Sequence, residues 1–242
     1  MSADPSSVRR PEPPDPDRPE GAPAAPGPVF AVLHGAHVPH AAAPTITFTL
    51  GVSEPEQREV YTIALTVQIH IDPALRPYSA EERARLVEMF GEAGRWAATT
   101  HSFLWARTDV LVPSFRGAAT FEVPVPCTYD LEVAASKYMD ALEDGSVPLS
   151  FHFSGTVFYR GDDGRLQLTQ IPWSASERWR MPVGAWRAMI AHHYPHGGWV
   201  SVHADTLARL QRVKASRGLP TFDACIDDLI DAAGADPPGE PA

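Results

Sequence analysis

Two sets of histidines are the residues with the clearest capacity for chemistry. They are His34, His37 and His40, at three-residue spacing, and His192, His193 and His196, near the end of a predicted helix. Imidazole nitrogens bind zinc and nickel, so either set could hold a metal ion. The first set has no carboxylate nearby in the sequence, and the second lies where a helix dipole favours histidine. We therefore expect solvated or helix-capping histidines at both places.

The two cysteines, Cys127 and Cys225, match neither a disulfide framework nor a CxxC metal motif. Cys127 follows Pro126 near the start of a predicted helix, where a thiolate could be stabilised. Because the sequence fixes no histidine beside it, we expect both cysteines to be small buried apolar side chains in a reducing compartment.

Carboxylates for acid–base chemistry are scattered rather than paired. They are Asp72, Asp109, Asp130 and Asp140, among turns and helix starts, and Asp130 has the position of a helix N-cap. The sequence contains no GxSxG, no HExxH, no P-loop and no GxGxxG before a helix. We therefore assign no catalytic, cofactor-binding or metal-ligating residue, expect no cofactor, and favour a protein that is not an enzyme.

The charge balance argues against nucleic acid and membranes as main partners. The formal net charge is -10, and such a surface repels phosphate. The sequence has no apolar run long enough to span a membrane. The basic pair Arg9 and Arg10 is not followed by the apolar stretch of an export signal, so we expect a cytoplasmic protein. The oligomeric state is left open.

Proline marks the N-terminal part of the chain. Residues 1–28 contain nine prolines and only one large apolar residue, Val8. Such a segment buries too little apolar surface to offset the entropy of ordering. The next residues, 29–44, could add a short strand or remain loose.

The elements that would position any site divide the chain into four parts. We predict a disordered tail over 1–44, an antiparallel-sheet domain over 45–180, a helical segment over 181–233 that packs on the sheet, and a second tail over 234–242.

Alternation of apolar and polar residues predicts the strands. The clearest runs cover residues 45–52, 61–71, 121–125 and 149–159. Clean alternation is typical of an antiparallel sheet with one face on the core. We place the strand that contains Leu65, Val67 and Ile69 at the centre, because it is the longest alternating run and contains no proline.

Helical spacing predicts helices between and after these strands. Ser79 and Glu82 form a capping box for a helix that runs to about residue 92. Apolar residues at helical spacing predict another helix over 131–142, which stops at Gly145. The fold class is therefore α+β: a mostly antiparallel sheet of five to seven strands, helices on one face, and a C-terminal helical hairpin.

The last ordered unit, residues 199–233, allows a second interpretation. A short strand with Val200 and Val202, followed by two helices, resembles a ribbon-helix-helix DNA-binding unit. The ribbon would offer Ser201 and His203 but no lysine or arginine, and the second helix is rich in aspartate. We therefore expect a packing element rather than a DNA reader.

Two stretches carry a resemblance to a known family. They are PVPCTYDLEVAASKYMDALEDGSVPLSFHFSGTVFY and RLQRVKASRGLPTFDACIDDLI. Together they resemble an actinobacterial family of unknown function, over roughly residues 45–232. Its members often lie near genes for nickel–iron uptake hydrogenases, and the resemblance implies no catalytic residues.

A more distant likeness is to SecB-type export chaperones. There too, strands lead through a cysteine-bearing segment into a helix and then into Gly-x-x-Pro-x-hydrophobic. The corresponding positions are Cys127, Tyr138, Gly145, Pro148, Leu149 and Phe151. This chain continues with a hairpin and three further helices, so tetramer formation and client binding are not carried over.

Three functions follow as hypotheses. The favoured one is a cytoplasmic accessory protein that binds a protein partner, as an assembly or chaperone factor for a hydrogenase-type system. The second is a small-ligand-binding domain or enzyme with a pocket between sheet and helices. The third is a transcription-associated protein that uses the C-terminal unit. An exposed apolar patch favours the first, and a large polar pocket favours the second.

Overall fold

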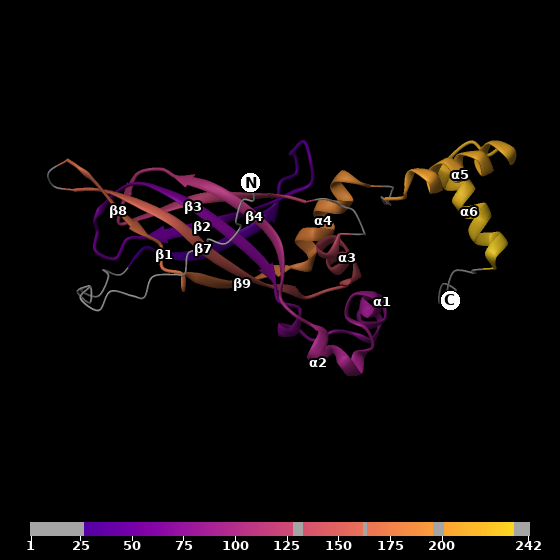
Figure 1. The fold of residues 1–242 in the computed structure, drawn as a ribbon, viewed down its shortest axis with the longest axis horizontal. Coiled ribbons are helices and arrows are strands. Elements are labelled where there is room, and N and C mark those ends of the chain that lie inside the picture. Colours follow the sequence, from indigo (N-terminus) through magenta and orange to yellow (C-terminus); the bar gives the residue numbers. More distant parts are fainter. Residues whose placement is uncertain (1–26, 128–132, 162–163, 196–200, 235–242) are drawn as a thin grey trace, which may run out of the picture.

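Two antiparallel sheets pack face to face and form an elongated body (Figure 1). The computed structural model describes residues 27–127, 133–161, 164–195 and 201–234. This described part contains nine strands and six α-helices. The predicted α+β class with antiparallel pairing is confirmed, and the strands divide between two sheets.

The smaller sheet has three strands and the larger one has six. The smaller sheet has the order β1 (Val29–His37), β2 (Thr45–Ser53) and β6 (Ala118–Pro126). The larger sheet has the order β4 (Phe103–Val112), β3 (Glu59–Ile71), β7 (Ser146–Arg160) and β8 (Leu166–Gln170). In addition, β5 (Phe115–Arg116) pairs with β3, and β9 (Ser176–Pro182) pairs with β7.

The strand predicted to lie at the centre does so. β3 pairs with β4 on one side and with β7 on the other, and Leu65, Val67 and Ile69 are buried. Period-two alternation therefore identified the strand that receives hydrogen bonds from both neighbours.

Phe48 of β2 contacts three strands of the larger sheet. Its ring meets Phe151 at 5.1 Å, Trp179 at 5.7 Å and Trp105 at 5.9 Å, each in an edge-to-face arrangement. These three partners come from β7, β9 and β4 of the larger sheet. Aromatic rings in this geometry attract each other beyond simple burial, so Phe48 fixes how the sheets face each other.

Two predicted boundaries are wrong. The tail predicted to reach residue 44 ends earlier, because β1 pairs with β2 along its length and buries Phe30 and Val32. The boundary at 180/181 cuts through β9, a strand that the alternation rule missed. The remainder of the first tail, residues 1–26, lies outside the described residues, as do 235–242.

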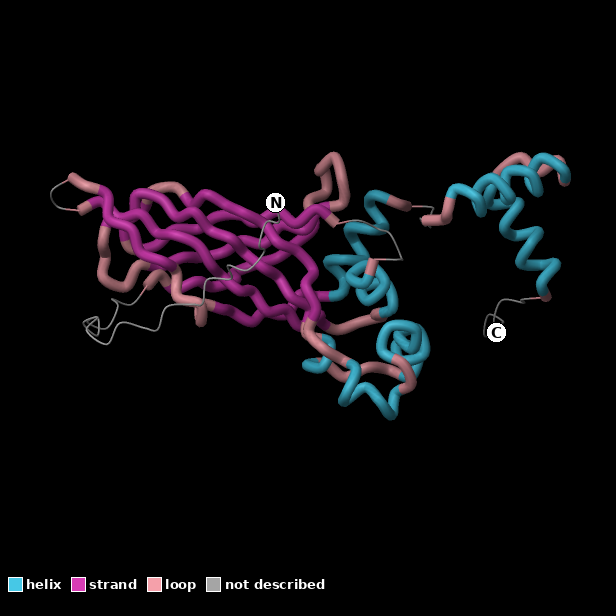
Figure 2. The backbone as a smooth tube through the Cα atoms, viewed as in Figure 1, coloured by secondary structure: helices cyan, strands magenta, loops and turns pink. Residues whose placement is uncertain are grey.

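Four helices gather at one end of the two sheets (Figure 2). They are α1 (Ala80–Phe90), α2 (Trp96–Thr99), α3 (Ala134–Ala141) and α4 (Val183–His193). The predicted capping box is present, since Ser79 Oγ accepts from the Glu82 N–H at 3.0 Å and Glu82 Oε2 accepts from the Ser79 N–H at 3.1 Å. No helix of the described part is long and apolar enough to cross a membrane.

The last two helices stand apart from the sheets (Figure 1). They are α5 (Ala204–Ser216) and α6 (Phe222–Ala233), which pack on each other. Of the segment over 181–233 that was predicted to pack on the sheet, the structure places only α4 against it. Residues 201–203 form no strand, so the ribbon of the DNA-binding interpretation is not seen there, and Val200 lies outside the described residues.

Gly155 allows β3 and β7 to approach each other in the middle of the larger sheet. Its φ is 138°, and a Cβ atom placed there would lie 2.0 Å from the carbonyl oxygen of Ala64. A backbone atom cannot move aside as a flexible side chain can, and L residues rarely adopt this φ.

We therefore predict that Gly155→Ala lowers the free energy of unfolding by about 3 kcal/mol or more, through strain and overpacking. Urea unfolding followed by circular dichroism measures this change. Gly184→Ala in α4 is the matched control, because no atom lies within 4 Å of the added methyl group. It should stabilise the protein by about 0.5–1 kcal/mol. Equal effects of the two substitutions would contradict the assignment.

Candidate functional site

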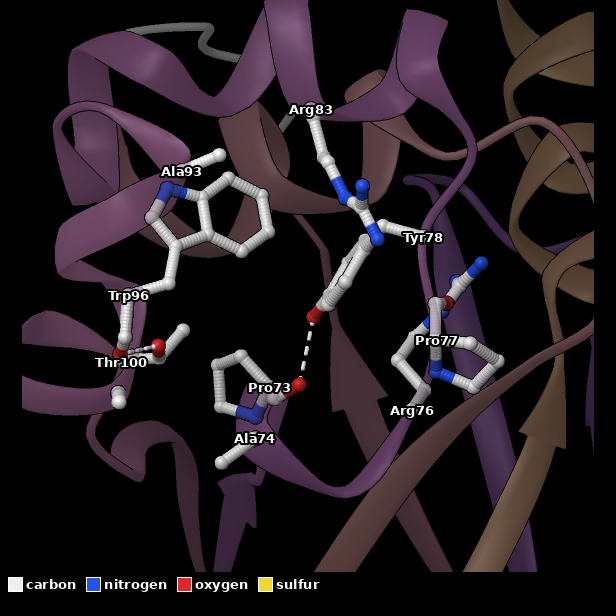
Figure 3. Close-up of a pocket in the computed structure, with 10 residues that line it drawn as sticks. Pro73, Ala74, Arg76, Pro77, Tyr78, Arg83, Ala93, Trp96 and Thr100 are labelled. Carbon is white, nitrogen blue, oxygen red and sulfur yellow. Dashed lines mark hydrogen bonds between the residues drawn. The ribbon is translucent and has the colours of Figure 1, made fainter.

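An open hollow of about 430 Å³ lies at the helical end of the body (Figure 3). Its lining combines two arginines, two aromatic rings and two prolines with small side chains. The lining residues are Pro73, Ala74, Arg76, Pro77, Tyr78, Arg83, Ala93, Trp96, Ala97 and Thr100. Most of them lie on the 3₁₀ turn η1 (Pro73–Leu75), the turn after it, the 3₁₀ turn η2 (Ala93–Arg95) and α2.

An aromatic cluster holds Trp96 and Tyr78 against the body. Their rings meet edge to face at 5.1 Å, and the Trp96 ring also meets Phe90 at 5.5 Å. Trp96 Nε1 donates to the carbonyl oxygen of Gly91 at 2.8 Å. Below them, Tyr138 of α3 contacts Tyr78, Phe90 and Phe103. The two rings that line the hollow are therefore fixed by packing and are not free to rotate.

A buried ion pair fixes the segment between η1 and α1. Arg76 Nη2 donates to both carboxylate oxygens of Glu82, at 2.8 and 3.1 Å, and to the carbonyl oxygen of Asp144 at 3.2 Å. Glu82 Oε1 also accepts from the N–H of Glu143 at 2.9 Å. Arg76 Nη1 is buried, and it has no hydrogen-bond partner among the described residues. The pair thus joins three segments and leaves one donor unused.

Tyr78 and Tyr138 share a hydrogen bond below the hollow. The Tyr78 hydroxyl donates to the carbonyl oxygen of Pro73 at 2.7 Å, so in the 2.8 Å contact between the two hydroxyls Tyr138 is the donor. Burial raises the pKa of Tyr78 to about 12 and raises the pKa of Tyr138 further. Both phenols therefore stay neutral and act as hydrogen-bonding groups at physiological pH.

Arg83 supplies the uncompensated charge at the hollow. Its side chain is exposed, and Figure 3 shows its guanidinium on the same side as the Tyr78 ring. Within the described ranges, no carboxylate lies within ion-pair distance of Arg83. A free guanidinium beside aromatic rings suits a ligand that joins an anionic group to a flat or apolar body.

The structure brings His37 and His40 of the first histidine set close to His192 of the second. The His192 ring lies 6.4 Å from the His37 ring and 6.3 Å from the His40 ring. Both ring nitrogens of His193 lie within hydrogen-bond distance of a carbonyl oxygen: Nδ1 is 3.1 Å from that of Met189, and Nε2 is 3.3 Å from that of Ala41. No group of three or more His, Cys, Asp or Glu side chains in the described ranges is arranged to hold a metal ion. His196 lies outside those ranges.

A second polar cluster escaped the sequence interpretation because its members lie on different strands. Asp72 accepts a hydrogen bond from Ser150 Oγ, and the rings of His70 and His152 meet at 5.1 Å. Burial and the neighbouring His152 lower the pKa of His70. Since Ser150 donates to a carboxylate and not to an imidazole, this cluster lacks the contact that activates a serine nucleophile.

The other candidates named from the sequence are dispersed. Asp109 accepts from Thr66 Oγ1 at 2.5 Å on the larger sheet, Asp140 lies on α3, and Asp130 is outside the described residues. Cys127 and Cys225 are both free and buried, and burial raises the pKa of Cys127 to about 12. This thiol is therefore protonated and unreactive in the folded protein.

The comparison with protein families gives a match over nearly all of the described chain. The matching family model is described as a family of unknown function (DUF6084), and it covers residues 26–238. The chain belongs to this family. The resemblance to a family of unknown function is therefore confirmed. No curated protein matches the chain.

Similar solved structures are distant. One is a late embryogenesis abundant (LEA) protein, 12% identical with a TM-score of 0.31, where the match covers 65% of this chain and 71% of that chain. A beta-glucosidase from Kluyveromyces marxianus is 7% identical, with a TM-score of 0.24 and coverage of 64% and 15%. The ApaA protein from Bordetella pertussis is 12% identical, with a TM-score of 0.23 and coverage of 64% and 94%. Likenesses this weak carry no argument about function.

The buried phenol of Tyr78 makes stability depend on high pH. Its pKa is raised from 10.0 to about 12, so the unfolded chain loses this proton first as the pH rises. The neutral, buried Tyr78 phenol contributes to the free energy of unfolding. This contribution is fully present below about pH 10 and is lost as the pH rises to 12. We predict that Tyr78→Phe reduces this decline, as measured by urea unfolding at a series of pH values.

Tyr61→Phe is the control for this pH series, because Tyr61 is 45% exposed and lies far from the hollow on β3. Its pH dependence should follow the wild type. If all three proteins lost stability with the same slope above pH 10, the raised pKa of Tyr78 would be wrong.

Proposed function

We propose that the protein is a cytoplasmic accessory protein that binds a protein partner by holding an extended segment of that partner in the hollow beside Trp96 and Tyr78. The observation that carries the proposal is the meeting of two fixed aromatic rings and one free guanidinium on an open surface. Fixed aromatic residues and arginine are the side chains that contribute most to binding energy at protein interfaces.

The chemistry of the hollow favours a segment that contains proline and a carboxylate. Aromatic-lined grooves bind extended proline-rich chains, which lose little entropy because they are already ordered. The lining residues Pro73, which is buried, and Pro77, which is exposed, are rigid and apolar. Arg83 can pair with a carboxylate that follows or precedes the proline. Ala74, Pro77 and Ala97 are exposed lining residues, so an extended chain that lies across the hollow could contact them.

The source of the partner is a finer proposal that rests on the family resemblance. Hydrogenase genes near members of such a family suggest a subunit or maturation factor of a nickel–iron hydrogenase. Chaperone-like assistance during assembly fits a protein that binds an extended segment, because such segments are accessible before a partner has folded.

A small ligand is the second candidate, because an anionic ring compound could pair with Arg83 and pack on Tyr78 and Trp96. The predicted pocket between sheet and helices is not where the hollow lies, since turns and helices line it without any strand residue. Volumes of this size occur among small-molecule sites, but those usually bury most of their ligand. The exposed rim of this hollow favours the peptide.

The test uses three fluorescein-labelled peptides of ten residues, made of alternating glutamate and proline, lysine and proline, or glutamate and serine. We predict that the glutamate–proline peptide binds most tightly, as measured by fluorescence anisotropy. Trp96→Ala should weaken its binding by roughly 30-fold, equivalent to about 2 kcal/mol. Arg83→Glu should weaken it as well and should remove the preference for glutamate over lysine.

Trp173→Ala is the matched control, because Trp173 is 95% exposed and does not line the hollow. Arg83 is exposed, so its variant remains informative if Trp96→Ala unfolds the aromatic cluster. Equal binding of the three peptides, or binding that Arg83→Glu leaves unchanged, would reject the peptide function.

A further inference from the structure

The hairpin of α5 and α6 carries an apolar stripe that stays partly exposed in the described part of the chain, where Lys214 lies over the Phe222 ring at 5.6 Å. Phe222, Ile226 and Ile230 recur at four-residue spacing on one face of α6 and are 39%, 44% and 44% exposed. In the hairpin, only Cys225 is fully buried, where its Sγ approaches the carbonyl oxygen of Leu210 on α5. Two helices alone bury too little apolar surface to be stable, so this unit needs a further surface.

The charges of the hairpin are separated between its two helices. α5 carries Arg209, Arg212 and Lys214 against one aspartate, whereas α6 carries four aspartates and no basic residue. Asp223, Asp227 and Asp231 each follow one residue of the apolar stripe, so an acidic row runs beside it. Within the described ranges, Arg217 and Asp228 form an ion pair across the hairpin, and these three aspartates have no basic partner.

We propose that the hairpin is a dimerisation unit, in which two copies of the chain form an antiparallel four-helix bundle. In a two-fold dimer, α5 of each copy lies against α6 of the other, and the same pairing is made twice. The basic side chains Arg209 and Arg212 of one copy then meet the acidic row of the second, and both apolar stripes are buried in the common core of the bundle.

A second copy fits this surface better than the sheets of the same chain. α5 and α6 stand away from the body (Figure 1), and Ile226 and Ile230 both remain 44% exposed. The hairpin is complementary in charge to a second copy of itself, because the basic α5 of one copy can face the acidic α6 of the other. Phe222 is 39% exposed in the single chain, so its ring is available to a second copy.

The oligomeric state of the full chain tests this proposal. Sedimentation velocity at micromolar concentration should give twice the mass of one chain, and Ile226→Asp together with Ile230→Asp should give a single-chain mass. Far-ultraviolet circular dichroism checks that the helices of this variant remain. A wild-type protein with the mass of one chain, or a dimer that the double variant leaves intact, would overturn the proposal.

Charge exchange tests which helices meet. Arg209→Asp with Arg212→Asp makes both helices of one variant acidic. In another variant, Asp227→Arg with Asp231→Arg reverses two of the three charges of the acidic row. Each variant alone should lose the dimer through like-charge repulsion, and a mixture of the two should form a mixed dimer. Arg107→Asp with Arg178→Asp, at exposed positions of the larger sheet, has the same charge change as the first variant and should stay dimeric. Variants that dimerise alone, or a mixture that does not, would overturn the pairing of α5 with α6.

Discussion

The packing of the two sheets around Phe48 is the contact on which the rest of the structure depends. Three aromatic partners from β4, β7 and β9 surround this ring, so the position of the smaller sheet determines where each of those strands can lie. The contact leaves no space beside it, because a Cβ atom at Gly35 would lie 2.7 Å from Phe48 and 2.8 Å from Trp179. Interiors packed to this density transmit shifts to neighbouring elements instead of absorbing them.

The buried ion pair of Arg76 and Glu82 fixes the turns at the helical end of the body. A buried ion pair is weak evidence for stability, because removing two charges from water has a high cost. Here each carboxylate oxygen accepts two hydrogen bonds. One comes from Arg76, and the other comes from a backbone N–H, of the N-cap Ser79 or of Glu143 in the turn after α3. The pair therefore selects one arrangement of the turn that lines the hollow, and the aromatic cluster then holds Trp96 in place.

Local pattern was enough to predict the strands and not enough to predict the site. β2 and β6 alternate along their length, β3 and β7 do so over most of theirs, and the capping box at Ser79 identified the start of α1. β9 was missed because it lies at the edge of the larger sheet and is mostly polar, with Arg178 and Arg180 on either side of Trp179. At such an edge, side-chain type is a poor guide to whether a segment forms a strand. The hollow forms because residues between 73 and 100 pack around Tyr138, which lies far away in the sequence. Local sequence pattern cannot reveal such a tertiary contact. The same holds for the two histidine sets, whose spacing in sequence carries no sign that β1 and α4 are neighbours.

The separation of the hairpin from the body has a consequence if both proposals hold. The hollow involves residues of the body alone, so a dimer formed through α5 and α6 would leave two hollows free in one particle. A partner that offers two extended segments could then occupy both. The second binding step becomes intramolecular, and its effective concentration can raise the overall affinity by about 10²–10⁴-fold without any new contact. Weak individual contacts at an open hollow would in this way add up to stable but reversible binding of a partner.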